Sequence, residues 1–464
     1  MSFFLYDITF LIIFGIFLTI FLILNRKKVK REGILILFKT KQGIKLIDRV
    51  AKTYKKCLNS FEYIVIFVGY ILMAGIIFLL LQLVYLFAKF PELVRAVKIP
   101  PIMPLIPYLP KIFNIDFLPP FYFTYWIVVL AIAAVSHEFF HGIFARARNI
   151  KIKSTGFAFL GPFTGAFVEP DERQVKKLKI KPQLAFVSAG TFANLLVAIL
   201  FFIIMWGFFV SAFTPSGVVF NTYTFSAINT SQIESIGNES FIINLNGDMN
   251  LTKISYQGNT YYVNGRDVQN LKDLDYVFAY EDAPALNAGV VGAIIEVDGV
   301  KIKEHVDLKQ ILDSKKPGEE IIVKTFFDDT IKEYKINLGK NPRNQSQAYL
   351  GIALINTEAS SFLGQIRSKL VFFKDPNTYY KPKSAENLTI FIYNLIWWIV
   401  LINFSVALVN MLPVGIFDGG RIFYLSILGL TKSEKTAKKA FALSTYIILL
   451  IFVLLTFLWF INFV

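Results

Sequence analysis

The chain has 464 residues, of which 55% are hydrophobic and only 17% are charged, and its mean hydropathy is +0.54. A soluble domain of ordinary composition has about 25% charged residues, so much of this length is expected to lie in a membrane. The formal net charge is +15, but its placement in alternate loops argues for membrane topology and against nucleic-acid binding. The single Cys57 excludes an internal disulfide and any CxxC motif.

Six apolar stretches each supply the roughly 20 residues that are needed to cross a bilayer. They are residues 5–25, 61–88, 121–145, 183–213, 387–412 and 439–463. In the first stretch the basic cluster NRKKVKR follows the apolar run instead of preceding it. That order indicates a membrane anchor and not a cleaved signal peptide.

The charges of the loops predict the orientation of the spans. Residues 26–60 contain 12 Lys and Arg against 2 acidic residues, residues 146–182 contain 9 against 3, and residues 419–439 contain 5 against 1. Residues 214–386 contain 18 against 21, and the Pro-rich residues 89–120 have few charges. Because Lys and Arg are retained on the cytoplasmic side, the N-terminus and residues 214–386 are expected outside, in a multi-pass protein of the cell membrane.

The large loop is expected to be a β-rich soluble domain, because its short alternating runs are separated by Asn, Gly and Ser. The predicted fold is therefore a polytopic α-helical membrane protein with about six spans and an inserted β-rich domain. Its predicted domains are 1–120 (two spans, a basic cytoplasmic loop and a Pro-rich external loop), 121–213 (first half of a membrane core), 214–386 (soluble domain) and 387–464 (second half of the core and a final span).

The stretch HEFFH in the third span holds two of the chain's three histidines. On a helix, His137 and His141 lie on one face, one turn apart, and can bind one Zn²⁺ together. Glu138 is then placed to act as general base toward a water molecule, as in the HExxH arrangement. Ionisable residues inside a spanning helix cost at least a few kcal/mol, which disfavours the alternative that these are ordinary buried histidines.

Catalytic zinc needs a third protein ligand. His305 lies in the soluble domain, on the far side of the membrane, so it is a poor candidate, and a surface role is favoured for it. Asp418 is the better candidate, because Asn410 and Pro413 interrupt the preceding span and unwound backbone at membrane depth must be covered by protein or line a cavity. Asp418 and His141 both fall near the cytoplasmic ends of their spans. The alternative role for Asp418 is a helix cap.

With HEFFH on one span and NMLPVGIFDGG on a later one, the chain resembles the site-2 protease family of intramembrane zinc metalloproteases. Residues 161–172 are similar to the family's membrane-dipping hairpin, and residues 188–200 to its Gly-x-x-x-Asn helix. APALNAGVVGAIIEVDGVKI resembles part of a PDZ domain. The family often has Leu-Asp-Gly where this chain has Phe417-Asp418-Gly419, and the PDZ-like stretch lacks the usual Gly-Asp.

The resemblance implies one Zn²⁺ per chain, held by His137, His141 and Asp418, with Glu138 as general base. It implies hydrolysis of peptide bonds in or next to transmembrane helices of membrane-protein substrates, as in regulated intramembrane proteolysis. The lipid bilayer is the expected surrounding, and the PDZ-like domain is a second place for contact with a substrate or peptide.

Five further residues become candidates for substrate contacts through the same resemblance. Asn194 and Asn410 are candidates to hydrogen-bond the substrate backbone or the oxyanion, and hydrogen bonding between helices is the equal alternative. Gly161, Pro162 and Gly165 belong to the hairpin, whose edge is expected to pair with an extended substrate segment.

Two other functions are compatible with parts of the pattern. A CAAX-processing membrane protease needs a Glu ligand on a later helix, whereas the later spans offer Asp418. A PDZ-bearing scaffold or receptor without proteolytic activity has no need of Glu138. The sequence also leaves open whether residues 214–386 hold one PDZ-like unit with an insertion or two units, and what the first two spans do.

Overall fold

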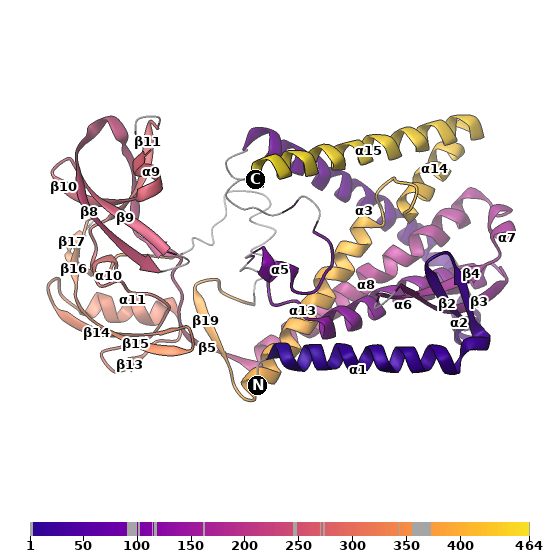
Figure 1. Cartoon of the computed structure of the whole chain (residues 1–464), viewed down its shortest axis with the longest axis horizontal. Coiled ribbons are helices and arrows are strands. Elements are labelled where there is room, and N and C mark those ends of the chain that lie inside the picture. The colour runs from indigo at the N-terminus through magenta and orange to yellow at the C-terminus, as the bar shows by residue number, and fades with distance from the viewer. Residues whose placement is uncertain are drawn as a thin grey trace. The chain divides into compact units, whose positions relative to one another are not determined.

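The computed structural model describes residues 3–90, 100, 103–113, 115, 118–160, 163–244, 248–269, 271, 274–342, 344–354 and 373–463. The chain forms two compact units (Figure 1). The helical unit comprises Met1–Phe208 with Ile390–Val464, and the β-rich unit comprises Phe209–Thr389.

Six helices among the described residues are long and apolar enough to cross a membrane. They are α1 (Phe3–Leu24), α3 (Lys55–Lys89), α6 (Phe123–Ala147), α8 (Ile180–Ala212), α13 (Glu386–Val409) and α15 (Glu434–Phe463). Each coincides with one of the six predicted stretches, so the prediction of a polytopic helical protein is confirmed. Shorter helices of this unit are α2 (Gln42–Thr53), α5 (Leu109–Ile112), α7 (Glu172–Lys176) and α14 (Asp418–Thr431).

The basic segment after α1 is more structured than its sequence suggests. After the short turn η1 (Arg26–Lys28) it forms β1 (Val29–Glu32) and β2 (Leu35–Thr40), which join the hairpin of β3 (Ile152–Leu160) and β4 (Phe163–Pro170). The result is a four-stranded antiparallel sheet in the order β1-β2-β3-β4. Gly156 is needed at the β2–β3 pairing, because a Cβ there would overlap the carbonyl of Phe38.

Helix α2 packs directly on α6. A Cβ on Gly142 would lie 2.8 Å from Cδ1 of Ile47, so the glycine allows α2 to approach the helix that carries HEFFH. Ile47 and Ala51 of α2 are 2% exposed and share a core with Ile143 and Ala189. The segment predicted as a basic cytoplasmic loop therefore contributes a packed layer to the membrane unit.

The second span, α3, packs closely against α8. A Cβ on Gly69 would lie 2.7 Å from Oγ of Ser188. Leu72 and Met73 of α3 extend this contact into a core that also contains Val187 of α8. The second span, whose role the sequence left open, is thus part of the membrane core.

The first span, α1, is tied to α6 by one buried carboxylate. Asp7 is 1% exposed. Its Oδ2 accepts hydrogen bonds from the Tyr108 hydroxyl (2.6 Å) and the Phe123 N–H (2.8 Å), and its Oδ1 accepts from the N–H (2.8 Å) and hydroxyl (2.7 Å) of Thr124. Phe123 and Thr124 begin α6, whose first N–H groups have no partner within the helix. Asp7 therefore caps α6 from another helix.

The main sheet of the β-rich unit has six antiparallel strands in the order β15-β14-β12-β5-β19, with β13 paired to β12. Helix α11 (His305–Ser314) joins the same core through Leu308. The strands are β5 (Phe213–Val218), β12 (Ala293–Val297), β13 (Val300–Lys301), β14 (Glu320–Phe327), β15 (Thr330–Asn337) and β19 (Thr378–Pro382).

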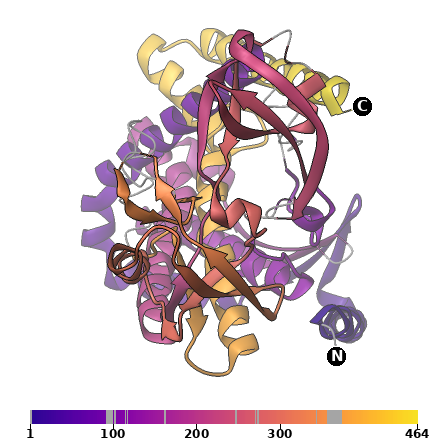
Figure 2. The same ribbon diagram turned by 90° about the vertical axis from the view of Figure 1, so that its left-hand side faces the viewer.

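A second sheet of the β-rich unit is an insertion into the first. It has the order β7-β11-β10-β9-β8, and Figure 2 shows it separate from the orange strands of the main sheet. Its strands are β7 (Phe225–Asn229), β8 (Ile233–Asn244), β9 (Asp248–Tyr256), β10 (Asn259–Asn264) and β11 (Tyr276–Glu281). Since β5 and β12 flank these strands in sequence yet pair at Val218 and Ile294, the arrangement is one unit with an insertion. An inserted β-rich region is confirmed.

The remaining elements of the β-rich unit are short. They are β6 (Thr222–Tyr223) paired with β18 (Ile352–Ala353), β16 (Gly339–Asn341) paired with β17 (Asn344–Tyr349), the turn η2 (Thr230–Gln232), α9 (Gly265–Gln269) and α10 (Pro284–Asn287).

Replacing Asp7 by Ala is expected to lower the free energy of unfolding by about 3 kcal/mol, because four partly buried donors lose their acceptor. Asp7→Asn, which keeps one acceptor oxygen, should lose less. Chemical denaturation in detergent measures both. Thr9→Ala on the exposed face of α1 is the matched control, since Thr9 Oγ1 bonds only to the Leu5 carbonyl in its own helix. An Asp7→Ala protein as stable as the Thr9→Ala protein would contradict the capping role.

Candidate metal centre

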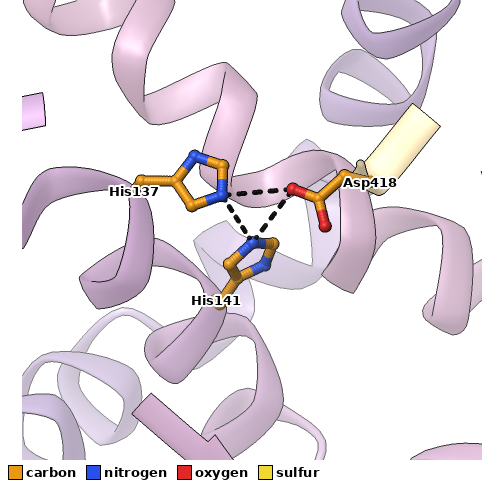
Figure 3. Close-up of side chains that lie close together, drawn as sticks. All are labelled: His137, His141 and Asp418. Atoms are coloured by element: carbon orange, nitrogen blue, oxygen red, sulfur yellow. Dashed lines mark hydrogen bonds and ion pairs between the residues drawn. The ribbon is translucent and has the colours of Figure 1, made fainter. Parts of the chain in front are cut away.

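Three side chains from two distant segments meet in the helical unit (Figure 3). His137 and His141 lie one turn apart on α6, and Asp418 begins α14. Asp418 Oδ2 lies 3.1 Å from Nε2 of His137 and 3.3 Å from Nε2 of His141, and the two Nε2 atoms are 3.0 Å apart. The structure thus brings together the three residues that the sequence predicts as metal ligands.

The hydrogen-bond partner of His141 Nδ1 indicates which nitrogen carries the proton when the ring is neutral. Its Nδ1 lies 2.8 Å from the backbone carbonyl of Phe186, an acceptor that requires a proton on Nδ1. In the neutral ring, Nε2 then carries a lone pair, and this lone pair faces His137 and Asp418. A carbonyl partner on the second nitrogen is the usual arrangement for a metal-binding histidine.

The spacing of the three atoms fits a tetrahedral cation. Zinc bonds of about 2.0–2.1 Å place neighbouring ligand atoms roughly 3.3 Å apart, close to the observed 3.0–3.3 Å. Asp418 Oδ2 is buried and makes no hydrogen bond within the described residues. A cation among the three atoms supplies the attraction that their lone pairs lack, so these residues fit a metal ion.

Asn194 on α8 holds His137 and is 0% exposed. Its side-chain amide lies 3.3 Å from Nδ1 of His137 and 3.2 Å from Oγ of Ser136, which also bonds to the Ala133 carbonyl. The assignment of amide oxygen and nitrogen is interchangeable. Turning the amide so that its oxygen faces His137 Nδ1 and its nitrogen faces Ser136 would place a proton on Nδ1 and leave Nε2 unprotonated, as a metal ligand requires. This geometry favours hydrogen bonding between helices for Asn194.

Gly190, one turn before Asn194, makes the space for the site. A Cβ on Gly190 would lie 2.5 Å from Nε2 of both His137 and His141. No side chain larger than hydrogen fits at this position while both rings keep their orientation. In the Gly-x-x-x-Asn pattern of α8, the glycine therefore leaves room for the two imidazole rings, and the asparagine provides a polar partner for His137.

Asp418 reaches the site because the chain unwinds before it. Helix α13 ends at Val409 and α14 begins at Asp418, so the break predicted from Pro413 is confirmed. The loop folds back on α14, since the Gly419 N–H donates to the Asn410 carbonyl at 2.7 Å. A Cβ on Gly419 would overlap the Met411 carbonyl, which explains a glycine directly after the ligand.

Glu138 is oriented by the hairpin. Its Oε2 accepts the backbone N–H of Val168 in β4 at 2.8 Å. Because Glu138 adjoins His137 on α6, this bond fixes the carboxylate between the sheet and the histidines. Neither Val168 nor Phe186 is predictable as a partner from the sequence, because both contribute backbone groups that any residue type possesses.

The other candidates lie as follows. Asn410 directly follows α13, and its carbonyl accepts the Gly419 N–H. Gly165 is paired with Ala158 within the hairpin, and Gly161 and Pro162 lie outside the described residues. His305, which the sequence disfavours as a ligand, begins α11 in the β-rich unit, where its Nδ1 lies 3.4 Å from Oδ2 of Asp375.

Gly190→Ala is expected to abolish stoichiometric metal binding, because the added methyl group displaces both imidazole rings. Metal content per purified chain, measured by elemental mass spectrometry, tests this. Gly207→Ala is the matched control in the same helix, since a Cβ there meets no atom within 4 Å. Equal metal content in the two variants would show that Gly190 does not shape the site.

Comparison with known proteins agrees with this geometry. The chain matches the sequence model of peptidase family M50 over residues 125–455, which is 331 of its 464 residues. It is also 25% identical over 299 residues to an uncharacterised protein of Methanocaldococcus jannaschii, covering 64% of this chain and 55% of that protein. The chain thus spans about half the length of this curated relative. Because the family match covers most of the chain and includes the His137, His141 and Asp418 cluster, the chain belongs to peptidase family M50, the site-2 protease family of membrane-embedded metalloproteases.

Proposed function

We propose that this protein is a zinc-dependent endopeptidase that hydrolyses peptide bonds in or next to transmembrane helices of membrane-protein substrates. The observation that carries the proposal is the meeting of His137, His141 and Asp418 in an apolar helical unit, with Glu138 beside them. One Zn²⁺ per chain would be held by the first three residues. Bound there, the ion supplies Lewis-acid polarisation of the scissile carbonyl and of a water molecule.

Glu138 is the general base in this proposal. Its Oε2 is held by the Val168 N–H, which leaves Oε1 to accept a proton from the attacking water and later to deliver it to the leaving amine. A scaffold without proteolytic activity has no use for a carboxylate oriented in this way.

The edge of β4 is the proposed place for the substrate backbone. β4 is the last strand of its sheet, and its N–H at Val168 points outward, toward Glu138. Outward groups recur at every second residue of a strand, so the next ones belong to Ala166 and Thr164. A substrate helix must unwind before cleavage, and an extended segment paired with this edge runs past Glu138.

The loop charges and the depth of the site support the proposed sidedness. His141 lies six residues before the end of α6 at Ala147, which is about 9 Å along the helix. The basic segment 146–182 follows and is proposed to be cytoplasmic. The site then opens near the cytoplasmic face of a multi-pass protein of the cell membrane, and the N-terminus and the β-rich unit are extracytoplasmic.

We also propose that the β-rich unit selects which substrates reach the membrane site. Its six-stranded sheet with α11 supports a PDZ-like module, and the inserted sheet enlarges it. A module of this size restricts access by substrates with large external domains. It also offers a surface that binds the chain ends of substrates already shortened by another protease. Regulated intramembrane proteolysis is the process in which such a filter operates.

Glu138→Gln is expected to reduce cleavage of a single-span substrate by at least about 100-fold, because the amide cannot accept a proton. Bound zinc should stay stoichiometric, since Glu138 is not among the proposed ligands. Reconstituted cleavage assays with parallel zinc analysis measure both quantities. Glu434→Gln, an exposed carboxylate paired with Lys438, is the control and should cleave like wild type. Full activity of Glu138→Gln, or an absence of zinc from the wild-type protein, would overturn the proposal.

Ala166→Pro tests the proposed strand pairing. It removes one outward N–H, and loss of one backbone hydrogen bond of about 1–1.5 kcal/mol predicts roughly tenfold slower cleavage with zinc retained. Ala166→Ser keeps the N–H and should cleave like wild type. The N–H of Gly165 faces β3 in this register. A proline at Gly165 would therefore disturb the pairing within the hairpin and would not test its outer edge. Equal cleavage by the Pro and Ser variants would rule out pairing at Ala166.

A further inference from the structure

The helical unit contains a second site that the proteolytic mechanism does not use. A cavity of about 530 Å³ is bounded by the end of η1, by β2, by the start of α2 and by β3. It is lined by Lys28, Lys39, Thr40, Lys41, Gln42, Lys45, Lys153 and Ser154. Five of these eight residues are lysines, and none is acidic.

The positive charge of this lysine pocket is mostly uncompensated. Lys39 is ion-paired with Glu32 (3.3 Å) and Glu169 (3.5 Å). Among the described residues, Lys28, Lys41, Lys45 and Lys153 have no ion pair. Four ammonium groups around one cavity repel each other, and a bound anion relieves that repulsion.

One neutral donor, the side-chain amide of Gln42, lies beside the lysines. The hydroxyl of Ser154 donates to Glu169 Oε2 at 2.6 Å, and the Gln42 N–H at the start of α2 donates to Thr40 Oγ1 at 3.2 Å, so both are used within the chain. The lysine ammonium groups therefore supply most of the phosphate-binding chemistry of this pocket.

The position of the pocket along the chain identifies the source of the phosphate. Lys28 lies four residues after the end of α1 at Leu24, and Lys153 lies six residues after the end of α6 at Ala147. Both helices are candidate membrane spans. The lining residues therefore sit where chains emerge from the hydrocarbon into the headgroup layer, where lysines attract anionic lipids.

We propose that the lysine pocket binds the phosphate of one anionic phospholipid headgroup. The positive-inside rule explains why lysines are abundant in residues 26–60, but it does not require them to surround a cavity. The pocket brings together the end of α1, the β2–α2 connection and β3. A bound headgroup therefore links three segments of the sheet and helix layer that packs on α6.

The test compares two lysine triplets from the same basic segment. The pocket variant is Lys28→Gln, Lys41→Gln and Lys45→Gln. The control variant is Lys27→Gln, Lys52→Gln and Lys56→Gln, which removes equal charge from exposed positions that do not line the cavity. Both variants lose three positive charges from residues 26–60. A difference in lipid binding between them is therefore due to the pocket. A third variant with Arg at the three pocket positions keeps the charge.

The full-length protein is reconstituted in nanodiscs of phosphatidylcholine with or without phosphatidylglycerol, and retained lipid is counted by native mass spectrometry. Wild type, control and Arg variants are expected to retain one phosphatidylglycerol. The pocket variant should bind it on the order of a hundredfold more weakly, at about 1 kcal/mol per lysine. Phosphatidylglycerol should also raise the melting temperature of wild type and not that of the pocket variant.

Two results would overturn the proposal. Equal retention of phosphatidylglycerol by the pocket and control variants would mean that only general surface charge attracts the lipid. Calorimetric binding of inorganic phosphate to wild type in phosphatidylcholine nanodiscs, as tight as that of the lipid, would assign the pocket to a soluble phosphate compound. Neither measurement depends on proteolysis, so failure here leaves the proposed enzymatic function untouched.

Discussion

Two imidazole nitrogens and one carboxylate oxygen lie within 3.0–3.3 Å of one another in an apolar surrounding, and this convergence constrains the rest of the helical unit. When both imidazoles carry their proton on Nδ1, the arrangement is unfavourable without a cation, because lone pairs face each other in surroundings that screen them little. The convergence leaves no room for a Cβ at Gly190, where it would meet both imidazole rings, or at Gly419, where it would overlap the Met411 carbonyl.

The same helix α6 is held at its first turn and at two positions in its second half by parts of the chain outside the core motifs. Asp7 caps its first turn, Ile47 of α2 fills the notch at Gly142, and β4 binds Glu138 through Val168. Two of these three supports come from residues that precede the family match at 125–455. The N-terminal elements therefore position the histidines as well as crossing the membrane.

The sequence predicts those structural features that depend on residue type and on the spacing of residues along one segment. Six apolar lengths predict the spans, the i and i+4 spacing places His137 and His141 on one face, and Pro413 predicts the break before Asp418. Pairings between distant segments are not predictable in this way. Phe38 and Phe157 pair in the sheet although 119 residues separate them, and alternation of side chains does not identify a partner strand. The sequence shows Asp7 as an acidic residue in an apolar helix, but it does not show the partners of that residue. Its four donors are backbone N–H and hydroxyl groups, which occur throughout the chain.

The buried charges of the helical unit supply an internal comparison for the metal hypothesis. Asp7 receives four hydrogen bonds, and Glu62, 2% exposed, is paired with Arg148 and lies 3.8 Å from Lys181. In both cases the chain itself provides the compensating donors or cations, as burial of a carboxylate demands. Asp418 Oδ2 instead faces the Nε2 atoms of His137 and His141 and accepts no hydrogen bond among the described residues. When both imidazoles carry their proton on Nδ1, a divalent cation would satisfy all three atoms at once.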